Sequence, residues 1–142
     1  MFSKSCEYAI RSVIIVCQNS KQGLKTNVKE ISERAGVPEP YIAKVMQILV
    51  KAHLVQSSKG PGGGFFIDAN NTELKLIDVV NAVDGDSLFT ACGLGLKECS
   101  EKNPCPLHDK FKDIRNNLKK MLMTTSIHDL SEKLVAFTYT SK

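Results

Sequence analysis

A glycine-rich stretch at positions 60–64 most constrains the fold of this chain. It reads Gly-Pro-Gly-Gly-Gly and separates two short runs, 54–59 and 65–68, whose residues favour extended backbone. Two extended runs around a glycine and proline turn predict a β-hairpin. Glycine backbone can approach another backbone closely, which suits contacts between N–H groups and DNA phosphates or a minor groove. Taken alone, the stretch is equally compatible with a flexible loop.

Two short helices are predicted directly before this hairpin. Asn27 is a good N-cap, and the carboxylate of Glu30 is placed to reach back to the cap. Gly36 supplies the turn that ends the first helix, and Pro38 and Pro40 suit the start of the second. The second helix has an apolar side and a polar, cationic side: Ile42, Val45, Met46 and Leu49 against Tyr41, Lys44, Gln47 and Lys51. Together the two helices predict a helix-turn-helix, for which the hairpin is a wing.

Further amphipathic helices are predicted on either side of this unit. Apolar residues recur at helical spacing over residues 4–19 and again over residues 75–84. Residues 86–106 show no regular periodicity, and Ser126 caps a last helix that carries Leu130, Leu134 and Phe137. The predicted fold is mainly α with a small β-hairpin wing. It divides into a winged helix-turn-helix DNA-binding domain, a cysteine-rich loop, and a dimerisation helix with a C-terminal helix: 1–84, 85–106 and 107–142.

The helix that begins near residue 107 has the rhythm of a helix that packs along a partner helix. Its apolar residues recur at alternating steps of four and three: Leu107, Phe111, Ile114, Leu118 and Met121. These apolar side chains need another surface to cover them and exclude water. A second copy of the chain is the expected cover, because a protein that reads one DNA half-site gains affinity and symmetry by pairing. Packing against the chain's own core is the alternative.

The excess positive charge lies in the first half of the chain. Residues 1–70 hold nine Lys or Arg and five Asp or Glu, whereas residues 71–142 hold ten of each. A basic surface suits DNA phosphates, because neutralising them releases condensed counterions. No apolar run is long enough to span a membrane, and Glu7 and Arg11 interrupt the N-terminal apolar residues that a signal peptide would need. The expected location is the cytoplasm, where thiols stay reduced.

Three cysteines fall in the aperiodic segment. Cys92, Cys99 and Cys105 are separated by six and five residues, and His108 follows the last by three. Thiolates bind zinc and iron–sulfur clusters, and structural zinc usually uses closer cysteine pairs. The wide spacing favours an iron–sulfur cluster wrapped by backbone, with zinc or free, redox-active thiols as alternatives. The two remaining cysteines, Cys6 and Cys17, are expected to be small core residues.

Four motifs spread over nearly the whole chain are shared with a known family. They are Ser-Cys-Glu-Tyr-Ala-Ile-Arg at 5–11, the Gly-Val-Pro turn at 36–38 with Tyr41, Lys-Gly-Pro-Gly-Gly-Gly-Phe at 59–65, and the three-cysteine loop. Together they resemble the Rrf2 family of winged-helix transcription regulators. The resemblance implies a homodimer crossed by the helix near residues 107–123.

The resemblance also implies an iron–sulfur cluster held by the three cysteines near the dimer axis. With His108 as the fourth ligand, the chain is similar to members that hold [2Fe–2S]. With Glu7 of the partner subunit, it is similar to members that hold [4Fe–4S]. One extra residue between Cys92 and Cys99 departs from both patterns and leaves the cluster type open, and some members work without a cluster.

DNA contacts are expected from the first helix, the second helix of the helix-turn-helix, and the wing. The expected residues are Lys4, Tyr8, Arg11, Pro40, Tyr41, Lys44, Gln47, Lys59, Gly60, Gly62 and Gly63. The chain carries Ala43 and Lys59 where relatives with a known operator carry a glutamate and an arginine, so an operator sequence cannot be transferred.

The expected function is that of a transcription regulator, a repressor, that binds a palindromic operator in double-stranded DNA. It senses redox state, nitric oxide or iron–sulfur status through the cluster. The alternative is a cluster-free regulator controlled by thiol oxidation or a protein partner. An electron-transfer protein or enzyme subunit built on the same scaffold is a third reading. It is disfavoured because the chain has no Walker, dinucleotide or nucleophile motif, so no enzyme activity is expected.

Overall fold

The structure is a computed structural model that describes residues 1–68, 71 and 73–134. The elements are, in chain order, α1 (Lys4–Ser20), α2 (Val28–Ala35), α3 (Glu39–Lys51), β1 (Gln56–Ser58), β2 (Gly64–Phe66), α4 (Leu76–Asp84), α5 (Ser87–Thr90), α6 (His108–Thr124) and α7 (Ile127–Lys133). The two strands pair antiparallel, with Gln56 opposite Phe66 and Ser58 opposite Gly64. The mainly helical fold with a hairpin wing is therefore confirmed. Within the described part, every helix is too short or too polar to cross a membrane.

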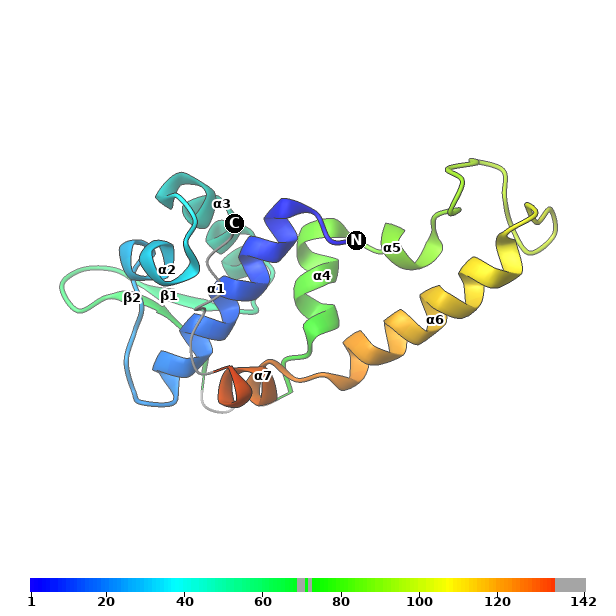
Figure 1. Cartoon of the computed structure of the whole chain (residues 1–142). Coiled ribbons are helices and arrows are strands. Elements are labelled where there is room, and N and C mark those ends of the chain that lie inside the picture. Colours follow the sequence, from blue (N-terminus) through cyan, green and yellow to red (C-terminus); the bar gives the residue numbers. More distant parts are fainter. Residues whose placement is uncertain (69–70, 72, 135–142) are drawn as a thin grey trace.

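Helix α1 lies at the centre of the molecule. It packs against α2, α3, α4 and α7, and Figure 1 shows it running through the middle of these elements. Because neighbours cover it on several sides, most of its middle residues are buried, including Val13, Ile15 and Val16. Cys6 and Cys17 are buried on the same helix, which confirms them as core residues. Residues 1–80 thus share one hydrophobic core, which Leu122 and Ile127 complete.

The helix-turn-helix forms as the sequence predicts, with one local difference. The Asn27 side chain accepts the N–H of Glu30 at 2.8 Å, and Gly36 ends α2 in the left-handed region at φ 69°. The carboxylate of Glu30 does not cap the helix, because it contacts Arg34 at 3.4 Å and the side chain of Asn19. An ion pair one turn along α2 holds this carboxylate away from the cap.

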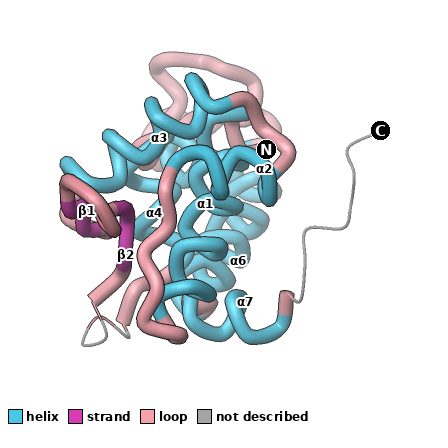
Figure 2. The backbone as a smooth tube through the Cα atoms, turned by 90° about the vertical axis from the view of Figure 1, so that its left-hand side faces the viewer, coloured by secondary structure: helices cyan, strands magenta, loops and turns pink. Residues whose placement is uncertain are grey.

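The wing is joined to the chain that leads into α2. The Thr26 N–H donates to the Phe65 carbonyl at 2.9 Å, and the Phe65 N–H donates to the Thr26 carbonyl at 2.8 Å. At the tip, a side chain on Gly63 would collide with the backbone carbonyl of Ser58, so only glycine fits there. The wing is thereby fixed relative to the helix-turn-helix. Figure 2 shows the hairpin at the left of the helices and α7 at the lower right.

An extended arm follows this body. Residues 86–106 were expected to be irregular, but they contain α5, a single helical turn. Helix α6 then leads from the cysteine loop back to the body, where it packs against α4 (Figure 1). Within residues 81–121, all of which the structure describes, His108 is the only buried residue. The arm therefore has almost no hydrophobic core of its own.

The apolar seam of α6 is divided between two environments. Leu118 packs against the body, and Leu122, which lies outside the predicted rhythm, is fully buried there. Ile114 and Met121 are 59% and 48% exposed. The chain's own core therefore covers one edge of the seam and leaves the other open.

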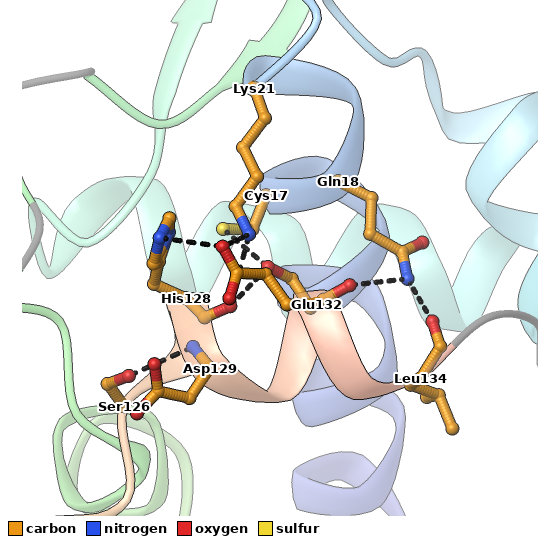
Figure 3. A network of polar contacts seen from close by, with 9 residues as sticks. Cys17, Gln18, Lys21, Ser126, His128, Asp129, Glu132 and Leu134 are labelled. Carbon is orange, nitrogen blue, oxygen red and sulfur yellow. Dashed lines mark hydrogen bonds and ion pairs between the residues drawn. The ribbon is translucent and has the colours of Figure 1, made fainter.

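Helix α7 ties the end of the arm to α1 through a polar network (Figure 3). The Gln18 side chain donates to the Leu134 carbonyl at 2.6 Å, and the Lys21 ammonium donates to the His128 carbonyl at 3.1 Å. Ser126 caps α7 through the N–H of Asp129 at 2.9 Å, as predicted. The predicted contribution of Phe137 lies outside the described residues.

Candidate functional site

The three cysteines of the arm converge on one point. The sulfur atoms of Cys92, Cys99 and Cys105 all lie within 4.8 Å of one another. Cys92 Sγ and Cys105 Sγ are 3.6 Å apart, and each of the three residues is half-buried. The fourteen residues from Cys92 to Cys105 thus bring three soft donors together just before the N-terminal end of α6.

Backbone N–H groups point at these sulfur atoms. The backbone N–H groups of Leu96 and Leu94 donate to Cys92 and, with smaller contributions from the other two thiols, lower the pKa of Cys92 to about 7. The Cys105 N–H donates to Cys99 Sγ at 3.4 Å, which by itself would lower the pKa of Cys99. Desolvation and the two neighbouring thiols outweigh this hydrogen bond, so the pKa of Cys99 is raised. Opposite pKa shifts in neighbouring thiols place negative charge on Cys92 first.

His108 closes one side of the cysteine group. It begins α6, its Nδ1 atom lies 3.5 Å from Cys99 Sγ, and only 7% of the residue is exposed. On its other side, Nε2 is buried and has no hydrogen-bond partner among the described residues. Glu101 Oε1 lies 3.6 Å from Nε2 and 2.7 Å from the ammonium of Lys112. Lys112, and to a smaller extent His108, holds the pKa of Glu101 below its usual range.

Besides the contacts of Glu101 and Cys99, two further contacts hold the cysteine loop against α6. The Arg115 guanidinium donates to the Ala91 carbonyl at 2.6 Å. The ring of Phe111 lies against Gly93 so closely that a side chain at this position would displace it. The loop is therefore attached to the same helix that carries His108.

The donor set fits a metal or an iron–sulfur cluster. Three thiols with one imidazole suit iron–sulfur chemistry and zinc, whereas a magnesium or calcium site would need oxygen ligands. A buried imidazole nitrogen directed at a thiol is the property expected of a fourth ligand. Glu7, the other candidate, lies in the first turn of α1, where Lys4 pairs with it at 3.3 Å. Neither Glu7 nor His108 belongs to the group of three converging thiols, but His108 lies 3.5 Å from Cys99 Sγ within this chain.

A second candidate surface is formed by α3 and the wing. Pro40, Tyr41, Lys44 and Gln47 are exposed, and 56% of Tyr41 is accessible. The opposite face of α3, which holds Ile42, Val45, Met46 and Leu49, is fully buried. Helix α3 therefore has one face fixed in the core and one free polar face of the length that a major groove accepts.

Two of the three predicted residues of α1, Tyr8 and Arg11, contact residues in or next to the helix-turn-helix. The rings of Tyr8 and Tyr41 lie with centroids 6.0 Å apart and planes inclined by 51°. Arg11 donates to the Ala35 carbonyl at 3.3 Å, close to the turn between α2 and α3. Lys59, Gly60 and Gly62 are exposed at the tip of the wing, and Gly63 is half-buried.

The buried and exposed faces of α3, with the wing behind it, define a winged helix-turn-helix regulator. The chain belongs to the Rrf2 family, described as iron-dependent transcriptional regulators, whose sequence profile matches residues 2–133. This confirms the family resemblance and the expectation of a regulator rather than an enzyme.

Named relatives and solved structures agree with this assignment. The chain is 30% identical over 132 residues to an Aquifex aeolicus protein named as an HTH-type transcriptional regulator. The alignment covers 92% of this chain and 90% of the relative. It is 29% identical over 123 residues to the regulator IscR of Photorhabdus laumondii, over 87% of this chain and 74% of the relative.

Two solved structures share the fold. CymR, the global cysteine regulator of B. subtilis, superposes with a TM-score of 0.76 at 20% identity, over 99% of this chain and 98% of CymR. IscR of T. potens superposes with a TM-score of 0.72 at 18% identity, over 100% and 93%.

Sequence reasoning did not find the residues that support the cysteine group. Glu101, Lys112 and Arg115 reach the site from the loop and from α6, and none belongs to a recognisable motif. The spacing of His108 and Lys112, four residues apart on one helix, was the available signal.

Proposed function

We propose that this protein is a homodimeric transcription regulator that binds DNA in the cytoplasm and acts as a repressor. Its DNA affinity depends on an iron–sulfur cluster bound by Cys92, Cys99, Cys105 and His108. The convergence of three thiols within 4.8 Å, beside a buried imidazole, supports the cluster. When bound, the cluster supplies reversible chemistry with oxidants and nitric oxide. The cysteines and His108 hold it in a loop attached to α6.

The open edge of α6 supports the dimer. Ile114 and Met121 lie seven residues apart on this edge, and both are about half exposed. Two helices that cross at this edge would cover these side chains, since apolar residues at this spacing pack into a facing helix. A dimer also presents two copies of α3, which fits a palindromic operator read as two half-sites.

Within each protomer, the DNA contacts divide by chemistry. Tyr41, Lys44 and Gln47 occupy the free face of α3 and are proposed to reach base edges in the major groove. Pro40 is exposed at the start of α3, Tyr8 lies beside Tyr41, and Arg11 donates to the Ala35 carbonyl before α3. These three residues and Lys4, in the first turn of α1, are proposed as further DNA contacts. In the wing, Lys59 and the backbone N–H groups of Gly60 and Gly62 are proposed to contact phosphate. The Gly63 N–H donates to the Gly60 carbonyl at 2.9 Å, so the proposed role of Gly63 is to let phosphate approach the turn closely.

Contacts across the body provide a route from the arm to the helix-turn-helix. The Leu76 N–H donates to the Thr125 carbonyl at 2.9 Å, which joins α4 to the end of α6. Gln18 then links α7 to α2, because it donates to Leu134 and accepts from Arg34 at 2.6 Å. A change in the cysteine loop moves α6, and through these contacts it changes the spacing of the two recognition helices.

The test is DNA affinity with and without the cluster. Binding duplexes are first selected from a random DNA library in two separate experiments, one with cluster-loaded and one with cluster-free protein. The two states should then differ in affinity by about 5- to 150-fold, the usual range of allosteric coupling. Cys99→Ala should bind like the cluster-free protein, and Cys17→Ala, which removes a thiol outside the loop, should retain both states. Equal affinity of the two states would contradict cluster control.

One observation favours a second candidate function. Cys92 Sγ lies 3.6 Å from Cys105 Sγ, and the pKa of Cys92 is about 7 because the backbone N–H groups of Leu96 and Leu94 stabilise its thiolate. Peroxide could take two electrons and two protons from this pair, which would form a disulfide and two molecules of water. In this case the purified protein would lack iron, and peroxide alone would change its DNA affinity.

A further inference from the structure

The environment of His108 is unusual for its part of the chain. Residues 81–121 contain one buried residue, and that residue is a polar imidazole. Its Nδ1 atom faces Cys99 Sγ at 3.5 Å, whereas Nε2 is enclosed by protein and lacks a hydrogen-bond partner in the part of the chain that the structure describes. A buried polar atom without a partner is costly, so its surroundings are expected to provide one.

The chemistry of imidazole decides what kind of partner Nε2 needs. A neutral imidazole carries its proton on one nitrogen and a lone pair on the other. If Nδ1 uses its lone pair to bind a metal, the proton must be on Nε2, and the buried Nε2–H requires an acceptor. Ligand histidines almost always donate this proton to a carboxylate, a backbone carbonyl or a water, which fixes both the tautomer and the orientation of the ring.

Glu101 stands where such an acceptor is needed. Its Oε1 atom lies 3.6 Å from Nε2, which is longer than a hydrogen bond. The Glu101 side chain is 67% exposed, so a small rotation can shorten this distance without displacing the core.

Lys112 keeps this carboxylate beside the imidazole. Its ammonium lies 2.7 Å from Oε1 of Glu101. Lys112 follows His108 by four residues on α6, so both side chains lie on one face of the helix. The carboxylate therefore spans the imidazole and the ammonium.

We infer that Glu101, held by Lys112, is a positioning residue that accepts the Nε2 proton of His108 and directs Nδ1 toward the site formed by Cys92, Cys99 and Cys105. This inference rests on the proposed function, since it assigns His108 as a ligand of the cluster. It also extends that function by naming the two residues that prepare the ligand.

The first test uses cluster-free protein and therefore does not depend on iron. Nitrogen-15 NMR of the imidazole at a pH where the ring is neutral reports which nitrogen carries the proton. The wild type should show His108 with the proton on Nε2. Glu101→Ala should lose this preference, whereas Glu101→Gln, which keeps a carbonyl acceptor, should retain most of it. A wild-type His108 with the proton on Nδ1 would overturn the inference.

The second test measures iron release from protein reconstituted with ferrous iron and sulfide. Glu101→Ala should lose iron to a chelator about 10- to 100-fold faster than the wild type, the range found for partners of ligand histidines. Lys112→Met should show a smaller increase in the same direction. Glu98→Ala and Lys110→Met, which remove matched charges from the same loop and the same helix, should release iron at the wild-type rate.

The outcomes separate the two proposals. Equal release by Glu101→Ala and Glu98→Ala from a protein that holds its cluster would overturn the role of Glu101 and leave the proposed function intact. A wild-type protein that takes up no iron would overturn the proposed function. In that event, a tautomer preference that is lost in Glu101→Ala would still support the contact between Glu101 and His108.

Discussion

The body and the arm of this protein are stabilised by different means. The body, residues 1–80, encloses a continuous core around α1, and its helices bury side chains such as Ile15, Met46 and Leu49 completely. Over residues 81–121, the arm buries only His108. The two regions also differ in the roles of their cysteines, which are packing residues in the body and converge on one another in the arm.

This difference indicates what each region needs in order to be ordered. Burial of apolar surface is the main favourable contribution to folding, so the body is ordered by its own core side chains together with Leu122 and Ile127, which complete that core. The arm has few such contacts, so its order depends mainly on polar contacts. The proposed cluster at its thiols and a second copy of the chain at the open edge of α6 would stabilise it further. A region of this kind responds readily to binding, because little other free energy holds it in one arrangement.

The reactivity of the cysteines gives the largest expected difference between the two regions. Desolvation by burial, with a smaller contribution from Asp84, raises the pKa of Cys6 to about 12, whereas that of Cys92 is about 7. At pH 8, about nine in ten Cys92 thiols but only about one in ten thousand Cys6 thiols would be ionised, and the thiolate is the reactive form.

Iodoacetamide should therefore modify Cys92 in cluster-free protein at least about a thousandfold faster than Cys6, as measured by peptide mass spectrometry. The rate at Cys92 should rise between pH 6 and pH 8 and then level off, because its thiol is already ionised above its pKa. The rate at Cys6 should stay low through pH 9. Similar rates at the two cysteines in folded protein would show that the body does not protect its thiols.

The next largest effect concerns stability. Leu49→Ala removes a fully buried side chain from the body and should lower the free energy of unfolding by about 2–5 kcal/mol. Ile114→Ala, at the open edge of α6, should change the unfolding of a protomer by less than about 0.5 kcal/mol, as is usual for exposed positions. Its expected effect is weaker association in sedimentation velocity. If urea denaturation showed that the two variants lose equal free energy of unfolding, the open edge of α6 would be as important for folding as the core.

The smallest predicted effect compares one lysine from each region in DNA binding. Lys59→Ala should weaken binding equally on specific and random duplexes and reduce the slope of log affinity against log salt by about 1, because one phosphate contact is lost. Lys119→Ala, on the exposed surface of α6, should leave both quantities unchanged. Fluorescence anisotropy at several salt concentrations measures both. If Lys59→Ala altered only the specific duplex, the wing would be reading bases instead.

The sequence predicted the body far better than the arm, for a physical reason. Helical periodicity, the Asn27 cap and the Gly36 turn each depend on neighbours within a few residues, and the structure confirms them. Helix α5 was missed because a single turn is too short to show a period. The burial of Leu122 was missed because it depends on where α6 crosses α4, which the spacing along α6 does not specify. The predicted domain boundaries stay predictions.

The candidate site divides in the same way. Cysteine is recognisable by type and spacing, so the three converging thiols could be named before their distances were known. The role of His108 as a ligand stays a prediction. Glu101 and Lys112 are ordinary surface residues in the sequence, and only the distances of 2.7 Å and 3.6 Å mark them as supports of His108. The supporting residues of such a site are therefore visible only in three dimensions.

The central claim, that the arm is built to hold an iron–sulfur cluster, is tested most directly on protein purified without oxygen. Ultraviolet–visible absorption is recorded together with iron and acid-labile sulfide analysis. A protein that binds the cluster is expected to be coloured and to contain matching amounts of iron and sulfide, both of which are lost in Cys99→Ala. Colourless, iron-free protein would contradict the claim and favour control of DNA binding by the thiols alone.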